Sequence, residues 1–407
     1  MKTANHRCIL RRSLTLATLA TLQGCSIPIY KLGIDACPTT TLATADKVTV
    51  QYLGVGGVLI AHGNDTVLTA PLYSNPSLIE FLMDHEVRTD TDLVDRLLPP
   101  EAARAKAIVV GHSHYDHFMD VAYVALHKAK GAKIYGSLTS KRLLAPIATD
   151  LAAQASGVVA LDGKAHIPGV QEGQWEEVSP TIRLMAVLSE HSDQVIAEVP
   201  FGPRLALHLG RGKLQADATR LPRTMSEWAE GTVFSYVIDF LDPKGAPVFR
   251  VYYQDSGTNK PVGYLPAHVK SDGKAVDLAI ICLGGAFSRL GDHPAGILVD
   301  TNPRFALLAH WEDFFVTQPA YCVNDASTRG DDRGIRGIPA AGVKLFGWWR
   351  QTDTERFMSM VDDTIRSMKL ATEAWWLPCP TWSHFELPLA GDTTKLVPYK
   401  AKTCPNP

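Results

Sequence analysis

The chain has 407 residues, of which 46% are hydrophobic and 20% are charged, and its formal net charge is −2. This balance is typical of a globular protein with a sizeable core, and it excludes the strongly basic surface that nucleic-acid-binding proteins usually carry. Beyond the N-terminal region, no stretch of the sequence reaches the roughly 20 apolar residues that a membrane span requires.

The first 24 residues have the order of a secretory signal. Three arginines precede an apolar run from Leu14 to Leu22, which is followed by Gln23, Gly24 and Cys25. Basic, apolar and small segments in this order predict a signal peptide over residues 1–24. The end of the segment, Leu22 to Cys25, resembles a bacterial lipobox, and Arg11-Arg12-Ser13-Leu14 partly resembles a twin-arginine signal. This implies export, a lipid on Cys25 and a tether over 25–45 on the periplasmic side of a bacterial membrane. Secretion and an uncleaved N-terminal anchor remain alternatives.

The seven cysteines divide into groups. Cys8 would leave with the signal and Cys25 would carry the lipid, whereas Cys282 lies in an apolar run and is expected to be a buried thiol. Export permits disulfides among the remaining four, although the sequence does not give their pairing. These four are Cys37, Cys322, Cys379 and Cys404, and the first and last are the favoured pair because both lie near chain ends.

Short apolar runs separated by Gly, Asn and Asp predict hairpin strands at 47–54, 56–63 and 65–71. They are followed by an expected helix at 75–86, a strand at 105–111 and a helix at 116–130. Further strands are expected at 181–188, 232–240, 248–253, 278–283 and 304–309, and apolar residues at helical spacing predict a helix over 353–370. The mixture predicts an α/β (α+β) fold, with sheets covered by helices, in one domain over 46–390 that ends in a tail over 391–407.

Candidate metal ligands follow four of the apolar runs. The run at 107–110 leads to His112 and His114, and the run at 182–188 leads to His191. In the same way, 249–253 leads to Asp255 and 305–308 leads to His310. Strands that end side by side would place these residues along one edge of a sheet, where functional loops are commonly assembled.

The densest group is "HSHYDH" at 112–117. Two histidines at i and i+2 in an extended loop project to the same side and can bind one ion, whereas Asp116 and His117 point elsewhere and can serve a second ion. Imidazole nitrogen and carboxylate oxygen suit zinc best, with iron or manganese as alternatives. Two ions about 3.5–4 Å apart would hold a bridging hydroxide and polarise a substrate oxygen.

This hexapeptide resembles the H-x-H-x-D-H signature of the metallo-β-lactamase superfamily, and the later candidates follow in that family's order from about Val48 to His310. The resemblance implies an αββα four-layer sandwich with a dinuclear site. The corresponding ligands are His112, His114 and His191 for the first ion, Asp116, His117 and His310 for the second, and Asp255 between them. Asp116 would also orient the nucleophile as a catalytic residue.

The resemblance also ranks the reactions. True β-lactamases lack the carboxylate that corresponds to Asp255, so the expected function is a hydrolase of ester-type bonds. Phosphodiesters or lactones are the favoured substrates, since the layout loosely resembles the branch of ascorbate-phosphate lactonase and N-acyl-phosphatidylethanolamine phospholipase D. β-Lactamase or thioesterase activity is an alternative, and a non-catalytic metal-binding envelope lipoprotein is an alternative of another class. The expected partner is a small-molecule or lipid substrate rather than nucleic acid, with membrane contact only through Cys25.

Several assignments keep an ordinary structural alternative. His191 can be a loop histidine, Asp255 a turn former before Ser256-Gly257, and His310 the cap of a core strand. The insertion at 192–231 is rich in Pro, Arg and Gly, so it is either a lid or a solvated excursion. As a lid, it would bring Arg204, Arg211, Arg220 and Arg223 to an anionic substrate group.

Overall fold

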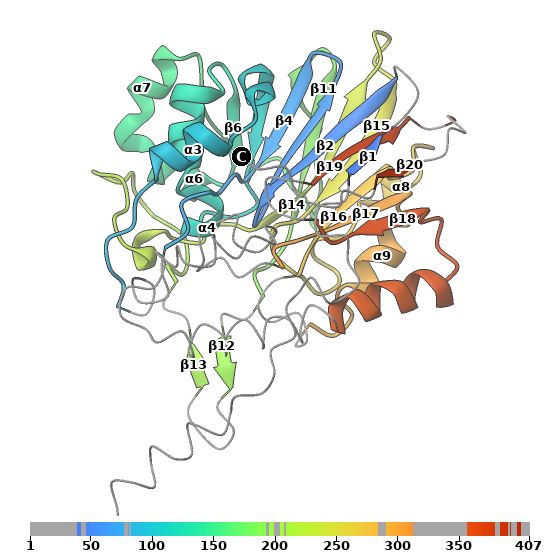
Figure 1. The fold of residues 1–407 in the computed structure, drawn as a ribbon. Helices are drawn as coiled ribbons and strands as arrows, with labels where there is room; N and C mark the ends of the chain where they lie inside the picture. Colours follow the sequence, from blue (N-terminus) through green and yellow to red (C-terminus); the bar gives the residue numbers. More distant parts are fainter. Residues whose placement is uncertain are drawn as a thin grey trace, which may run out of the picture.

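Two large β-sheets pack face to face, and helices cover both outer faces (Figure 1). The computed structural model describes residues 39–41, 46–76, 80, 83–192, 195–198, 204–206, 209–283, 290–311, 356–378, 383–389, 391 and 397–399. The signal, Cys25 and the four cysteines considered for disulfides lie outside these residues, as do residues 77–79, 81 and 82 of the expected helix at 75–86.

The first sheet combines an antiparallel meander with a parallel half. β2, β3 and β4 pair antiparallel, and β4 to β7 run parallel. In sheet order the strands are β20 (Val397–Tyr399), β1 (Thr39–Thr41), β19 (His384–Pro388), β2 (Lys47–Gly54), β3 (Gly57–His62), β4 (Asp65–Thr69), β5 (Ala105–Val109), β6 (Lys133–Gly136) and β7 (Gly157–Ala160). β1 and β20 fall in the segments expected to be tether and tail, and both extend this sheet.

The second sheet contains the remaining long strands. β11, β14 and β15 pair antiparallel, and β15 to β18 run parallel. In sheet order the strands are β18 (Ala374–Trp376), β17 (Phe305–Ala309), β16 (Leu278–Cys282), β15 (Pro247–Tyr253), β14 (Phe234–Leu241), β11 (Ile182–Leu188), β8 (His166–Ile167) and β9 (Gln171–Glu172), with β10 (Glu176–Ser179) on β11. A separate hairpin in the insertion pairs β12 (Val195–Glu198) with β13 (Arg204–Ala206).

Three apolar clusters define four layers. The helices of the first outer layer are α3 (Thr91–Leu97), η2 (Pro100–Arg104), α4 (Tyr115–Phe118), α5 (Val121–Tyr123), η3 (Val124–Lys128), α6 (Leu138–Leu143), η4 (Ala145–Ile147) and α7 (Ala148–Ala153). The other outer layer contains α8 (Ala267–Lys270), α9 (Ala295–Thr301) and the helical residues 356–367. A third cluster lies between the sheets and draws on strands of both. The expected αββα sandwich is therefore confirmed.

Strand periodicity explains this layering. In β14, Phe234, Tyr236 and Ile238 enter the core between the sheets, whereas Val237 packs under the helices of the second sheet. Successive side chains of a strand point to opposite faces, so a strand buried on both faces is apolar throughout. The five strands expected between 181 and 309 are confirmed, as is Cys282 as a buried free thiol.

The helix expected at 116–130 is divided in the structure. α4 ends at Phe118, and after α5 the chain forms a π-helical turn, η3, in which the Ala129 amide bonds to the Val124 carbonyl. At the break, the buried carboxylate of Asp120 accepts hydrogen bonds from the amides of Tyr73 (2.7 Å) and Ser74 (3.0 Å). This contact ties the segment to the loop that follows β4.

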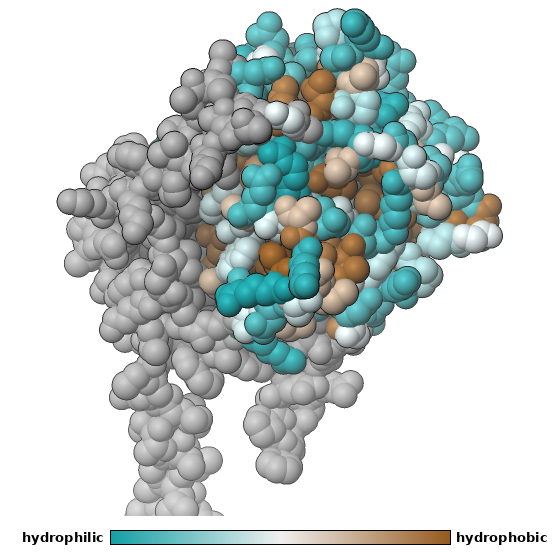
Figure 2. Space-filling view, turned by 90° about the vertical axis from the view of Figure 1, so that its right-hand side faces the viewer, coloured by the Kyte–Doolittle hydropathy of each residue, from teal (hydrophilic) through white to brown (hydrophobic). Residues whose placement is uncertain are grey.

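The described surface is mixed in character. On the side that carries β15 and β18, hydrophilic residues dominate and apolar residues gather near the centre (Figure 2). Among the described helices, none has the length and apolar character needed to cross a bilayer.

Candidate metal centre

Five histidines and two aspartates meet where strands of both sheets end. β5 of the first sheet leads to the segment 112–117. In the second sheet, β11, β15 and β17 run in the same direction and lead to His191, Asp255 and His310. All seven residues predicted from the sequence therefore lie at one edge of the sandwich, each just beyond the strand that was expected to position it.

The first potential metal site is a triangle of histidines. Ligand nitrogens of His112, His114 and His191 lie within 4.8 Å of one another. The ring centroids are 4.7 Å apart in each of the three pairs. His112 and His114 are buried, and His191 is partly exposed. Three imidazoles with one open side are the donor set of a catalytic rather than a closed structural zinc site.

A second group surrounds Asp116. His112, Asp116 and His117 also offer ligand atoms within 4.8 Å of one another. Asp116 Oδ2 lies 3.5 Å from His117 Nε2 and 3.4 Å from His310 Nε2. The rings of His117 and His310 are 5.1 Å apart. The structure thus brings together the three residues expected at the second ion, with His112 shared between the two groups.

Asp255 lies between the two groups. Its Oδ1 is 2.9 Å from His112 Nδ1, and its Oδ2 is 3.5 Å from His117 Nδ1 and accepts a 2.8 Å hydrogen bond from the Gly111 amide. These contacts are those of a carboxylate that orients histidine ligands, an arrangement common around metal sites. A direct bridge between two ions stays a prediction.

Several donor atoms of the cluster are buried without a hydrogen-bond partner. They are Nε2 of His112, Oδ1 of Asp116 and both ring nitrogens of His117. A buried polar atom that forms no hydrogen bond costs about 1–3 kcal/mol, so such groups require an explanation. Metal coordination supplies one, because nitrogen and carboxylate oxygen in this arrangement match the ligands of zinc and related ions. The residues present therefore fit a metal.

The protonation states suit the same role. Burial lowers the pKa of His114 to about 3 and that of His117 to about 4, and it lowers the pKa of His191 well below its usual value. Burial alone would raise the pKa of Asp116, but the neighbouring His117 and His310 outweigh it and hold that pKa well below the usual range. Neutral imidazoles and an ionised carboxylate are the forms that bind metal ions.

His112 differs from the other histidines. Burial opposes its protonation, but the adjacent Asp255 carboxylate outweighs this effect and raises the pKa of His112. The same contact assigns the proton to Nδ1, which donates to Asp255 Oδ1, and it leaves the Nε2 lone pair facing the cluster.

The insertion forms one wall of the centre. His114 Nε2 donates to the carbonyl of Gly210 at 3.0 Å, which leaves Nδ1 as the ligand atom. The carbonyl of Glu230 accepts from the Ser113 amide at 2.9 Å, and Trp228 packs edge-on against Phe118 of α4. Gly210, Trp228 and Glu230 of the insertion therefore support the segment 113–118, whereas most of residues 211–223 between them are exposed to solvent.

Sequence reasoning missed two glycines that touch the ligands. A Cβ on Gly111 would lie 2.1 Å from Asp255 Oδ1, and a Cβ on Gly56 would lie 2.6 Å from His117 Nδ1. The turn after β2 also receives His310, whose amide bonds to the Val55 carbonyl at 3.0 Å. The glycine-rich "LGVGG" at 53–57 and the glycine directly before His112 were the available signals.

Replacing Gly111 by alanine should weaken metal binding by about 10- to 100-fold, the range typical of lost outer contacts around a site. The new methyl group would overlap the Asp255 carboxylate and displace the partner of His112. Competition with a chromophoric chelator measures the affinity. Gly163→Ala is the matched control, because no atom lies within 4 Å of the Cβ position there. Equal affinities in both variants would contradict the role given to Asp255.

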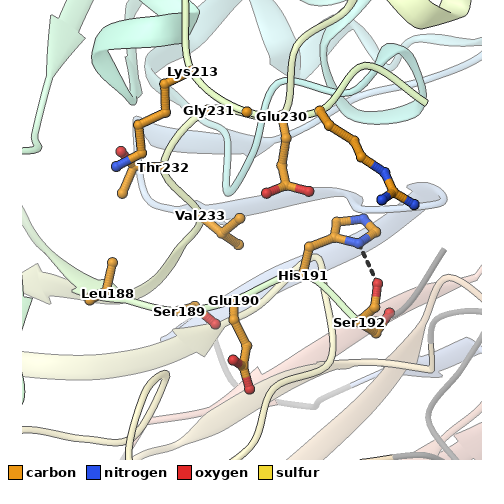
Figure 3. Close-up of a pocket in the computed structure, with 12 residues that line it drawn as sticks. Leu188, Ser189, Glu190, His191, Ser192, Lys213, Glu230, Gly231, Thr232 and Val233 are labelled. Carbon is orange, nitrogen blue, oxygen red and sulfur yellow. Dashed lines mark hydrogen bonds between the residues drawn. The ribbon is translucent and has the colours of Figure 1, made fainter. Parts of the chain in front are cut away.

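A pocket opens beside His191 (Figure 3). Its volume is about 430 Å³, and the Glu230 carboxylate points toward the His191 ring. His191 Nδ1 lies 2.6 Å from the Ser192 carbonyl, so Nδ1 carries the proton and Nε2 is the available ligand atom. The described lining consists of Leu188, Ser189, Glu190, His191, Ser192, Arg211, Gly212, Lys213, Glu230, Gly231, Thr232 and Val233. Substrate can therefore approach the histidine triangle from this side.

Of the four arginines considered for an anionic group, Arg211 lines this pocket, whereas Arg220 is paired with Glu227 on the surface.

Comparison with known proteins gives similarity only at the level of structure. No family model matches the sequence, and no curated protein matches it. Igni18, a metallo hydrolase from Ignicoccus hospitalis, aligns with a TM-score of 0.39 at 12% identity over 88% of this chain and 100% of its own. CmlA, a diiron β-hydroxylase from Streptomyces venezuelae, aligns with a TM-score of 0.42 at 13% identity over 85% of this chain and 55% of its own.

A third solved structure is a Thermotoga maritima protein described as a zinc-dependent hydrolase of the metallo-β-lactamase superfamily. It aligns with a TM-score of 0.28 at 10% identity over 65% of this chain and 77% of its own. The chain spans only about half the length of CmlA.

Proposed function

We propose that the chain is a metal-dependent hydrolase of the metallo-β-lactamase type that uses a dinuclear zinc centre to cleave an ester-type bond. The observation that supports this most directly is the pair of ligand groups that share His112, one of which includes His191 on the lining of a pocket. A purely structural metal site would be closed by protein ligands, whereas this one has a partly exposed histidine on its open side.

The protein's own residues have separable roles in this proposal. Bound divalent ions would supply an activated water near neutral pH and a positive charge that polarises the scissile bond. Asp116 is ionised and buried, so its carboxylate can accept a hydrogen bond from a water molecule and orient it toward the substrate. Asp255 and the Gly210 carbonyl hold the proton-bearing nitrogens of His112 and His114, which keeps the other ring nitrogens directed inward.

The carboxylate of Asp255 supports one class of substrate bond over another. Its position beside both ligand groups supports a phosphodiester or lactone rather than a β-lactam, given the family resemblance stated for this residue. The test is a panel containing bis-p-nitrophenyl phosphate, a γ-lactone, a thioester and the β-lactam nitrocefin, each offered to zinc-loaded protein. Preferential turnover of nitrocefin would overturn this ranking.

Metal analysis tests whether the folded chain binds the ions that the proposed hydrolysis requires. We expect close to two zinc ions per folded chain after reconstitution and dialysis, read by elemental analysis. A folded protein that retains no metal would remove the basis for catalysis and favour a non-catalytic envelope lipoprotein.

Export and lipid attachment complete the proposal. The N-terminal arginines, the apolar run and Cys25 support a lipoprotein held on the periplasmic side of a bacterial membrane. Mass spectrometry of the mature protein should find an acylated Cys25 as its first residue, and a free N-terminus elsewhere would contradict the lipobox interpretation.

A further inference from the structure

The pocket beside His191 is unusually polar for a small-molecule site. Among its described lining residues, only Leu188 and Val233 carry aliphatic side chains. Small-molecule pockets of this size usually have mainly apolar walls with a few precisely placed polar groups. The lining therefore favours a small polar or charged ligand over a long acyl chain.

Two cations on this lining are available to a ligand. Arg211 and Lys213 are exposed, and neither forms an ion pair with any residue that the structure describes. They flank Gly212, whose φ of +79° forms the turn that separates the two side chains. Exposed cations that form no ion pair contribute little to the stability of the fold, but at a pocket wall they can hold an anion through charge-assisted hydrogen bonds.

A buried hydroxyl gives a second, independent indication. Ser189 is 7% exposed and lines the pocket, and its Oγ has no hydrogen-bond partner. A buried hydroxyl is normally satisfied, so this enclosed one lacks a partner that a ligand in the pocket can supply after rotation of the Ser189 side chain. The Ser189 amide donates to the Val233 carbonyl at 2.9 Å, so Ser189 lies on the same side of the pocket as Thr232 and Val233. Figure 3 shows it well separated from Lys213.

The acidic residues of the lining offset this charge only in part. Burial raises the pKa of Glu230 and the nearby charges of His112 and Arg211 oppose that effect, so Arg211 has an acidic neighbour, but the two form no ion pair. Glu190 Oε1 accepts a 3.0 Å hydrogen bond from the Asn259 amide, and its carboxylate lies away from Lys213 in Figure 3. Glu230 is directed toward His191, and its Oε2 lies 3.9 Å from His114 Nε2, on the side of the metal centre.

We infer that the pocket binds an oxyanion of the substrate, a carboxylate or a phosphate, with Arg211 and Lys213 supplying the charge and Ser189 a hydrogen bond. This inference rests on the proposed hydrolase function and narrows its substrate to small anionic esters. The anion would sit in the pocket while the scissile bond lies toward His191 and the histidine triangle.

Binding is the first measurement, because it does not require turnover. Succinate and inorganic phosphate are titrated by calorimetry into zinc-loaded wild type and into R211Q/K213Q. We expect the double variant to bind the preferred anion at least about tenfold more weakly, as expected for the loss of charge-assisted hydrogen bonds. The anion whose affinity falls more in the double variant shows whether the substrate's oxyanion is a carboxylate or a phosphate. Lys244→Gln, an exposed site on the β14–β15 hairpin, should bind like wild type.

Kinetics is the second measurement. Mono-p-nitrophenyl succinate and p-nitrophenyl acetate have the same leaving group and differ in the carboxylate. We expect the ratio of their kcat/KM values to fall at least about tenfold in R211Q/K213Q. S189A should lower the ratio by a smaller factor, since it removes one hydrogen bond and no charge.

The outcomes separate the two proposals. Equal anion affinity in wild type and R211Q/K213Q would overturn the inference and leave ester hydrolysis intact. Anion binding that is lost in the variant, together with no hydrolysis of any ester by wild type, would support the pocket and overturn the proposed function. Circular dichroism confirms that each variant is folded.

Discussion

Asp116→Ala should reduce hydrolysis by at least about 10³-fold while the chain stays folded. The substitution removes the only carboxylate of the second ligand group, and with it the acceptor that faces both His117 and His310. Two functions are lost together, because the same side chain is expected to hold the second ion and to orient the attacking water. Initial rates on the preferred ester, with zinc content measured in parallel, give the result.

The matched control is Asp150→Ala. Asp150 is exposed on α7 and belongs to neither ligand group. Activity and zinc content of this variant should therefore both stay close to wild type. We expect Asp116→Ala to retain about one zinc ion, since the triangle of His112, His114 and His191 does not include it. Normal turnover by this variant would refute the catalytic assignment of Asp116.

Acid should destabilise the metal-free protein well before its carboxylates titrate. The pKa values of His114 and His117 in the folded chain, about 3 and about 4, lie below the value near 6.5 expected in the unfolded chain. The unfolded state therefore binds more protons between pH 6.5 and 4, and stability falls as the pH is lowered through this window. Each such histidine contributes up to about 1.4 kcal/mol per pH unit.

Other groups of the cluster modify this slope in known directions. The pKa of His191 is lowered like that of His114, so His191 adds to the loss of stability in acid. The raised pKa of His112 reduces that loss. Urea unfolding of the metal-free protein at pH 7.5, 6 and 5 measures how the free energy of unfolding changes with pH. In His114→Gln this change should correspond to nearly one proton fewer taken up on unfolding. Identical slopes in wild type and variant would show that His114 is not held neutral by the fold.

The sequence was informative where the chemistry is local. The hexapeptide at 112–117 contains four of the seven candidates at short spacing, and each later candidate follows a recognisable apolar strand. Because strands of one direction end at the same edge, the pattern of strand followed by ligand was enough to predict that His191, Asp255 and His310 come together.

Contacts between distant segments could not be predicted in this way. The Gly210 carbonyl that orients His114 comes from a loop 96 positions away, and nothing in its sequence marks it as a partner. The short strands β1 and β20 lack the length and alternation that identify a strand in a sequence. They are defined by their pairing with each other and by the pairing of β1 with β19. Ser189 is inconspicuous in the sequence because its significance depends on being buried without a partner.

The position of the candidate centre across the two sheets has a further consequence for the lifetime of the folded chain. His112 and His114 follow a strand of one sheet and His191 follows a strand of the other, and His112 meets Asp255 across 143 positions of sequence. An ion held by these residues would join the two sheets, and because its ligands come together only in the folded chain, its binding free energy would add to the stability of the fold. The metal supply would then affect the stability of the folded chain as well as its activity, since a chain that loses its ions also loses the metal-mediated contact between its two sheets.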